Sequence, residues 1–274
     1  MGNEDLGKHL HAMGDLPKAF EAFSRMRQDS SSTKQIIDVS KHLIEVASEQ
    51  RNWIAVASNA SKIRNLMSQL DGGDPSLQPF VMAADAVASM DGGNFYEAAQ
   101  LFMKVEPGMG TNCNKIVAPN DIAIYGGLCA LATMERNELQ SKVLENSNFR
   151  TYLELEPHIR RAIGFFVNSR YSACLGILES YRTDYFLDLH LQKHIDELYY
   201  LIRSKSIVQY FIPFSCVTLD SLNEQFAVAG RTIDKELATM IQRNELNARI
   251  DTQNRVGSPH LTISITKPFL NYTN

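Results

Sequence analysis

Apolar residues recur along most of the chain at the three- and four-residue spacing of amphipathic helices. One such stripe follows the candidate cap Thr33 and predicts a helix to about residue 49, and a second predicts a helix over 53–70. Further helices are predicted over 77–90, 95–105, 121–134 and 137–145. A Gly- and Pro-containing turn at 71–75 and a surface loop at 106–119 interrupt them. This region is predicted to be helical throughout.

Two segments of this region are similar to each other. Residues 14–23 and 93–102 both place a glycine at a turn, then an apolar residue at +2, alanine at +5 and phenylalanine at +9. Residues 169–178 repeat the spacing without the glycine, with Cys174 and Leu178 in the last two places. The pattern resembles tetratricopeptide-type helical hairpins, which bury their apolar faces by stacking on one another. A helical bundle with alanines at its contacts is the alternative interpretation.

The pattern changes after about residue 205. A helix entering this region ends at Pro213, and Thr218 is placed to cap a short helix. The inward positions of this helix and the next are Leu219, Leu222 and Phe226, then Ile233, Leu237, Met240 and Ile241. Residues 246–251 alternate apolar and polar, which predicts a strand, and residues 255–256 are predicted to begin the returning strand. This order is typical of a winged helix.

We therefore predict an all-α fold, in which a helical-repeat solenoid is followed by a winged helix with a small β-hairpin. The predicted boundaries are 1–190 for the repeat region, 191–260 for the winged-helix part and 261–274 for a tail. The first repeat begins close to Met1, so we expect the chain to start inside a longer solenoid.

Charge argues against nucleic-acid binding, which a winged helix otherwise suggests. The 274 residues carry 27 Lys and Arg against 31 Asp and Glu, a net charge of −4. The candidate recognition helix, 231–243, carries Asp234 and Glu236, whereas a reader of phosphates should be basic there. We expect this module to bind protein, and a nucleic-acid binder remains the less favoured alternative.

Motifs of catalysis, metal binding and targeting are largely missing from the sequence. It has no phosphate-binding loop, dinucleotide-binding fingerprint, nucleophile elbow or H-E-x-x-H. His190 and His194 stand four residues apart near Asp188 and Glu197, but two histidines without further fixed ligands are a poor zinc site. We expect no enzyme activity, cofactor or metal. The four cysteines form no C-x-x-C pair, and no signal peptide or apolar span is apparent, so an intracellular protein without a membrane partner is expected.

A helical solenoid that leads into a winged helix resembles the PCI family, which supplies subunits to the proteasome lid, the signalosome and a translation initiation factor. Four stretches are similar to the subunit-one family of the COP-nine (constitutive photomorphogenesis) signalosome. They are 119–133, 153–157, 169–175 and 207–213. The similarity covers about residues 94–256. The corresponding proteasome-lid subunit shares the architecture and is the second hypothesis.

This resemblance implies a non-catalytic scaffold, found in nucleus and cytoplasm, in a hetero-oligomer that removes a ubiquitin-like modifier from cullin–RING ubiquitin ligases. A separate metalloprotease subunit would perform the hydrolysis, and other PCI subunits would be the neighbours. Winged helices of the family align edge to edge. The matching edge comprises Asn247, Ala248, Arg249, Ile250 and Asp251, with the 232–243 helix behind it. The family's usual carboxyl-terminal helix has no counterpart in residues 260–274.

Overall fold

The computed structural model describes residues 2–68, 77–107, 113–214, 216–226, 233–251 and 262–265. Contacts divide the chain into two compact units. Unit 1 comprises Met1–Arg160 together with Asp188–His194, and unit 2 comprises Arg161–Leu187 together with Ile195–Asn274.

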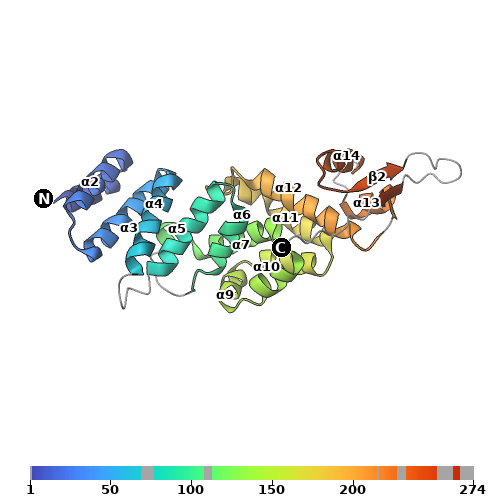
Figure 1. The fold of residues 1–274 in the computed structure, drawn as a ribbon, viewed down its shortest axis with the longest axis horizontal. Coiled ribbons are helices and arrows are strands. Elements are labelled where there is room, and N and C mark those ends of the chain that lie inside the picture. Colours follow the sequence, from blue (N-terminus) through green and yellow to red (C-terminus); the bar gives the residue numbers. More distant parts are fainter. Residues whose placement is uncertain are drawn as a thin grey trace. The chain divides into compact units, whose positions relative to one another are not determined.

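Unit 1 is a stack of helices in which each of the first six packs against the next (Figure 1). Its helices are α1 (Asn3–Ala12), α2 (Leu16–Asp29), α3 (Thr33–Glu49), α4 (Trp53–Met67), α5 (Leu77–Asp91), α6 (Phe95–Met103), α7 (Pro119–Thr133), α8 (Arg136–Glu138) and α9 (Ser147–Leu155). A 3-10 turn, η1 (Cys113–Lys115), precedes α7, and a π-helical segment, η2 (Leu139–Leu144), follows α8. Because consecutive helices bury their apolar faces on one another, this arrangement is a solenoid.

Most helix positions agree with the periodicity, and the differences have local causes. The cap of α3 is Ser32 rather than Thr33: Ser32 Oγ accepts the Gln35 N–H at 3.2 Å, and the Gln35 side chain accepts the Ser32 N–H. The helix predicted over 137–145 is instead the short α8 followed by η2. The predicted turn at 71–75 and the middle of the 106–119 loop lie outside the described residues.

The repeated segments begin with the same backbone turn. Gly14 and Gly93 both have φ of 79°. Each glycine donates its backbone N–H to the carbonyl of the residue three positions earlier. The residue that follows each glycine donates its N–H to the carbonyl of the residue five positions before it. This is the Schellman end of a helix. Ser169 (φ 60°) and Arg51 (φ 56°) make the same pair of hydrogen bonds without glycine. The 169–178 repeat is therefore confirmed in its turn, and the turn at Arg51 was not predicted.

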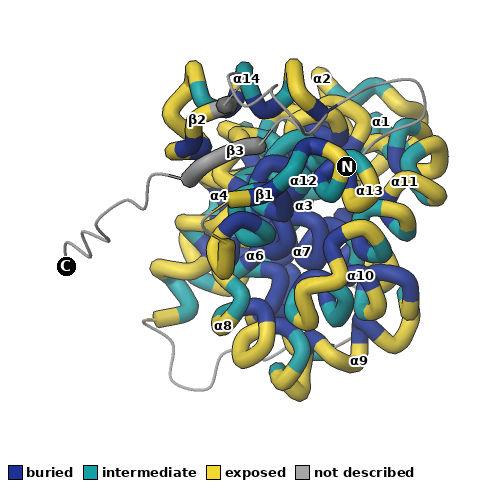
Figure 2. The backbone as a smooth tube through the Cα atoms, turned by 90° about the vertical axis from the view of Figure 1, so that its right-hand side faces the viewer, coloured by how far each residue is buried: buried dark blue, intermediate teal, exposed yellow. Residues whose placement is uncertain are grey.

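Helices α6 and α7 contribute many buried residues to the core of unit 1 (Figure 2). Every residue of α7 from Leu128 to Leu131 is fully buried. Gly126 allows this close packing, because a Cβ there would lie 2.8 Å from Phe149 Cζ and 3.0 Å from Phe102 Cβ. In both glycine-containing repeats the alanine and the phenylalanine are also fully buried, as the repeat predicts. These residues are Ala19, Phe23, Ala98 and Phe102.

Unit 2 combines helices with a three-stranded sheet. Its elements are α11 (Tyr171–Leu187), α12 (Ile195–Phe211), β1 (Cys216–Thr218), α13 (Leu219–Phe226), α14 (Asp234–Gln242), β2 (Ala248–Asp251) and β3 (Thr262–Ile265), and α10 (Pro157–Val167) crosses the division between the units. The sheet order is β1-β3-β2 with both pairs antiparallel. Val217 and Ile250 both pair with Ile263.

The predicted faces of α13 and α14 are largely confirmed. Leu219, Leu222 and Phe226 are buried, as are Ile233, Leu237 and Met240, while Ile241 is half-buried. Thr218 Oγ1 accepts the Ser221 N–H at 3.2 Å, so Thr218 caps α13 as expected. The strand β1 was not predicted. A returning strand is present at Thr262–Ile265, and its predicted start at 255–256 lies outside the described residues.

The fold class is thus the predicted one, a helical-repeat solenoid and a winged helix with a small sheet. The boundaries at residues 190 and 260 stay predictions. The compact units follow contacts instead, and β3 falls within the segment predicted as a tail.

Candidate interaction surfaces

The β2 strand forms one edge of the unit 2 sheet, because β3 occupies the centre. Within the candidate surface Asn247–Asp251, the side chains alternate as the sequence predicts: Asn247 and Arg249 are exposed, whereas Ala248 is buried. For Ile250 and Asp251 the structure describes the backbone, which pairs with β3. A backbone edge of this kind can accept a further strand by main-chain hydrogen bonding.

The β2 edge is held in place by α14 and α12. Leu246, just before the strand, is buried, α14 packs beside β2, and Leu237 and Met240 of α14 are buried. The Arg203 guanidinium of α12 donates to both Glu236 carboxylate oxygens, at 2.7 and 2.9 Å. Tyr200 donates to Glu245 Oε2 at 2.6 Å. These bonds fix the turn that leads into β2 and thereby orient the edge.

The two histidines considered as metal ligands do not share a helical face. Residues 188–194 form turns between α11 and α12 and belong to unit 1. The His190 ring meets Trp53 and Tyr125 edge-on, with centroids 5.4 and 6.1 Å apart, while His194 meets Phe95 at 5.5 Å. Within the described ranges no cluster of metal-ligating side chains occurs. The absence of a metal in the protein stays a prediction.

Asp188 shapes this turn. Its carboxylate accepts the Tyr125 hydroxyl at 2.8 and 3.0 Å and the backbone N–H groups of His190 and Leu191 at 2.8 and 2.7 Å. Burial is the main reason that the pKa of His190 lies below its usual value and that of Tyr125 above it. The neutral imidazole therefore suits its aromatic surroundings.

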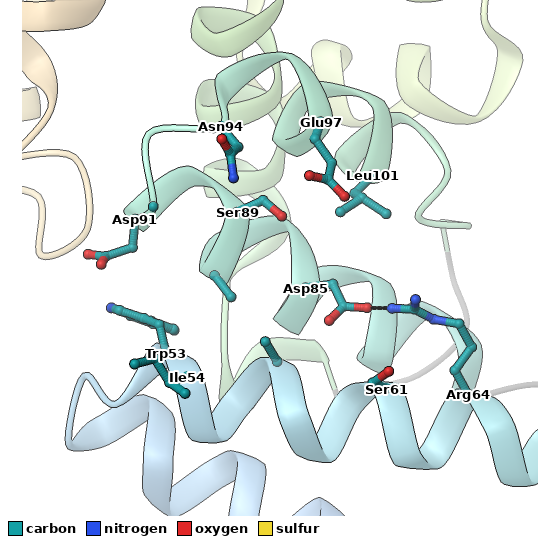
Figure 3. Close-up of a pocket in the computed structure, with 13 residues that line it drawn as sticks. Trp53, Ile54, Ser61, Arg64, Asp85, Ser89, Asp91, Asn94, Glu97 and Leu101 are labelled. Atoms are coloured by element: carbon teal, nitrogen blue, oxygen red, sulfur yellow. Dashed lines mark ion pairs between the residues drawn. The ribbon is translucent and has the colours of Figure 1, made fainter.

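Sequence reasoning missed a groove in unit 1 between α4, α5 and α6. Its volume is about 500 Å³, and its lining includes Trp53, Ile54, Asp85, Glu97 and Leu101 (Figure 3). One signal was available: Ile54 falls off the apolar stripe that Trp53, Val56 and Ala60 define, and it is 86% exposed. A single exposed apolar residue is common on protein surfaces, so this signal alone does not predict a site.

Unit 1 and unit 2 together define a class of protein, the helical-repeat proteins that carry a PCI-type winged helix. No helix in the part of the chain that the structure describes is both long enough and apolar enough to cross a membrane. Residues 1–142 match the family model described as 26S proteasome subunit RPN7, and residues 178–256 match the PCI domain. The chain belongs to the RPN7 family.

Among the relatives, the COP9 signalosome complex subunit 1 of Neurospora crassa is 48% identical over 93% of this chain and 60% of its own length. The protein of the same name in Emericella nidulans is 45% identical over 93% of this chain and 53% of its own length. The 26S proteasome non-ATPase regulatory subunit 6 of Dictyostelium discoideum is 23% identical over 87% of this chain and 62% of its own length. The chain thus spans somewhat more than half the length of these relatives.

Proposed function

We propose that the chain acts as a non-catalytic scaffold subunit of the COP9 signalosome. In this proposal it helps to assemble, with other PCI subunits and a metalloprotease subunit, the complex that deneddylates cullin–RING ubiquitin ligases. Its place of action would be the nucleus and the cytoplasm, which imaging of the tagged protein would test.

The observation that carries this proposal is the difference in identity between two groups of relatives. The two fungal relatives named as signalosome subunits are 45–48% identical to this chain, and the proteasome relative is 23% identical. The match of residues 1–142 to the RPN7 model favours the proteasome lid as the second candidate. Both candidates are scaffolds of the same class, so the purification below is designed to separate them.

The mechanism would be positional. The β2 edge offers backbone donors and acceptors, and the α12 and α14 contacts hold that edge rigid. A strand from a neighbouring subunit would extend the sheet by main-chain pairing, and the exposed Asn247 and Arg249 side chains would contribute to the choice of partner. The solenoid of unit 1 would present a separate surface.

Affinity purification of the tagged full chain from its own cells, followed by mass spectrometry, tests the proposal. We expect other PCI subunits, the metalloprotease subunit and cullins to co-purify. Recovery of proteasome-lid subunits instead would support the second candidate, and recovery of the chain alone would contradict both.

Adjacent proline substitutions test the edge itself. Neighbouring residues of a strand direct their N–H groups to opposite sides of the strand. One of the variants Arg249→Pro and Ile250→Pro therefore loses an N–H that faces β3. The other loses an N–H on the free edge and leaves the pairing of β2 with β3 intact. Ala248 is less suitable, because its N–H already donates to the Leu246 carbonyl at 3.2 Å. We expect one variant to keep the wild-type melting transition and yet lose its partners. Normal co-purification of both folded variants would refute edge pairing.

A further inference from the structure

The groove of unit 1 has apolar walls that water covers in the isolated chain. Trp53 and Ile54 begin α4 and line one end of the groove, and Leu101 of α6 lines the end near Arg64 (Figure 3). Ile54 is 86% exposed, whereas Trp53 is half-buried and its ring is braced by His190. A braced aromatic ring beside an exposed aliphatic side chain forms a rigid apolar surface, which is stabilised when a ligand covers it.

Charges in the groove leave an excess of negative charge. Asp85 on α5 forms an ion pair with Arg64 of α4, and Lys193 donates to the Asp91 carboxylate at 3.1 Å. Glu97, in the first turn of α6, is exposed and makes no ion pair with any residue that the structure describes. Because the two cations are already engaged, Glu97 is the carboxylate that is free to receive a positive group.

These features select the chemistry of an occupant. Phosphates and acidic peptides would be repelled by the carboxylates, and the described residues include no cluster suited to a metal ion. The apolar wall on α4 and the free carboxylate on α6 face the same space (Figure 3). A lysine or arginine next to an apolar side chain satisfies both, since its aliphatic stem packs on apolar surface while its charged end reaches a carboxylate.

We propose that this groove binds a peptide segment of a partner protein in which a lysine or arginine lies beside an aliphatic or aromatic side chain. The apolar side chain covers Ile54 and Trp53, and the cation pairs with Glu97. The site is distinct from the β2 edge, and its test uses no other subunit, so its failure would leave the proposed role in assembly unaffected.

Selection from a phage-displayed library of random peptides, with the full chain as bait, tests the proposal. We expect the enriched sequences to combine a basic residue with a neighbouring apolar one. The most enriched peptide is then synthesised with a fluorophore, and its affinity is measured by anisotropy. Glu97→Lys should weaken binding about tenfold, by loss of the ion pair and added repulsion. Raising the salt concentration should weaken binding to the wild type.

Ile54→Ala should also weaken binding about tenfold, because it removes apolar surface that the ligand covers. This variant will fold, since the Ile54 side chain has few contacts to lose. Asp5→Lys is the matched control for Glu97→Lys: Asp5 is an exposed acid in the first turn of α1 and lies outside the groove lining. It should leave the affinity unchanged. Failure to enrich any peptide, enrichment of acidic peptides, or equal effects of Glu97→Lys and Asp5→Lys would each overturn the proposal.

Discussion

Gly126 should tolerate no side chain, although alanine is the better helix former. In an exposed helix, Gly→Ala stabilises by about 1 kcal/mol. A Cβ on Gly126, however, would lie 2.8 and 2.9 Å from two atoms of the Phe149 ring and 3.0 Å from Phe102 Cβ. Both phenylalanines are fully buried, so neither can move without displacing further core residues. Overpacking of this kind costs about 1–3 kcal/mol.

The net effect of Gly126→Ala is therefore a destabilisation of up to about 2 kcal/mol, the difference between the steric cost and the gain in helix propensity. For a unit of this size, that loss lowers the melting temperature by up to about 8 °C. Differential scanning calorimetry of the full chain measures it. Gly176→Ala is the control of opposite sign: Gly176 lies exposed on α11 with no atom within 4 Å of its would-be Cβ, so alanine should raise the transition of its unit.

A double mutant identifies the cause. Phe149→Leu shortens the side chain whose Cζ meets the new Cβ, so Gly126→Ala should cost less in that background than in the wild type. The reasoning would be refuted if Gly126→Ala matched or exceeded wild-type stability. Equal costs in the two backgrounds would show that the close approach of α7 and α9 is not the reason for glycine.

Three further predictions concern other parts of the fold. Arg51→Gly should stabilise the chain by about 1 kcal/mol in urea denaturation, because positive φ is strained for every residue with a Cβ; an unchanged midpoint would show that the turn carries no strain. Tyr125→Phe removes the hydroxyl bonded to Asp188 and should cost about 1.5–3 kcal/mol, with faster hydrogen exchange over 188–194 as the local readout. Burial raises the pKa of the Cys174 thiol to about 12, so at mildly alkaline pH iodoacetamide should modify exposed Cys216 long before Cys174.

Several helices of unit 1, such as α3 and α4, were predictable because apolar residues recur along them at helical spacing. Residues 188–194 show where the argument fails. The spacing of His190 and His194 fits a helix, yet the Asp188 carboxylate accepts N–H bonds from His190 and Leu191 and thereby stabilises a turn. An aspartate that bonds the backbone locally competes with helix formation. Its partner Tyr125 is 63 residues away in the sequence, so periodicity carries no signal of the contact.

The sheet was predicted in part for a similar reason. The alternation that predicts β2 covers six residues, 246–251, whereas β1 has three residues and β3 four, too few for a pattern to stand out. Polar and apolar residues alternate in Thr262–Ile265, but this short segment between Pro259 and Pro268 does not predict a strand by itself. Pairing of β3 with both β1 and β2 depends on distant segments, and this makes β2 an edge. The candidate surface was thus predictable as a strand, while its edge position required the three-dimensional pairing.

The turn at Arg51 explains why one repeat escaped detection. Arg51 makes the same two backbone hydrogen bonds as Gly14, and the positions five and nine residues later, Val56 and Ala60, are fully buried like their counterparts Ala19 and Phe23. Stacking of the following helix therefore imposes the turn, and glycine only lowers its cost. The larger side chain comes first in the Val56–Ala60 pair and second in the Ala19–Phe23 pair. Either order is possible, because the space between neighbouring helices has to be filled but no particular residue is needed at either position. The two buried positions therefore define the repeat better than the residue at the turn does.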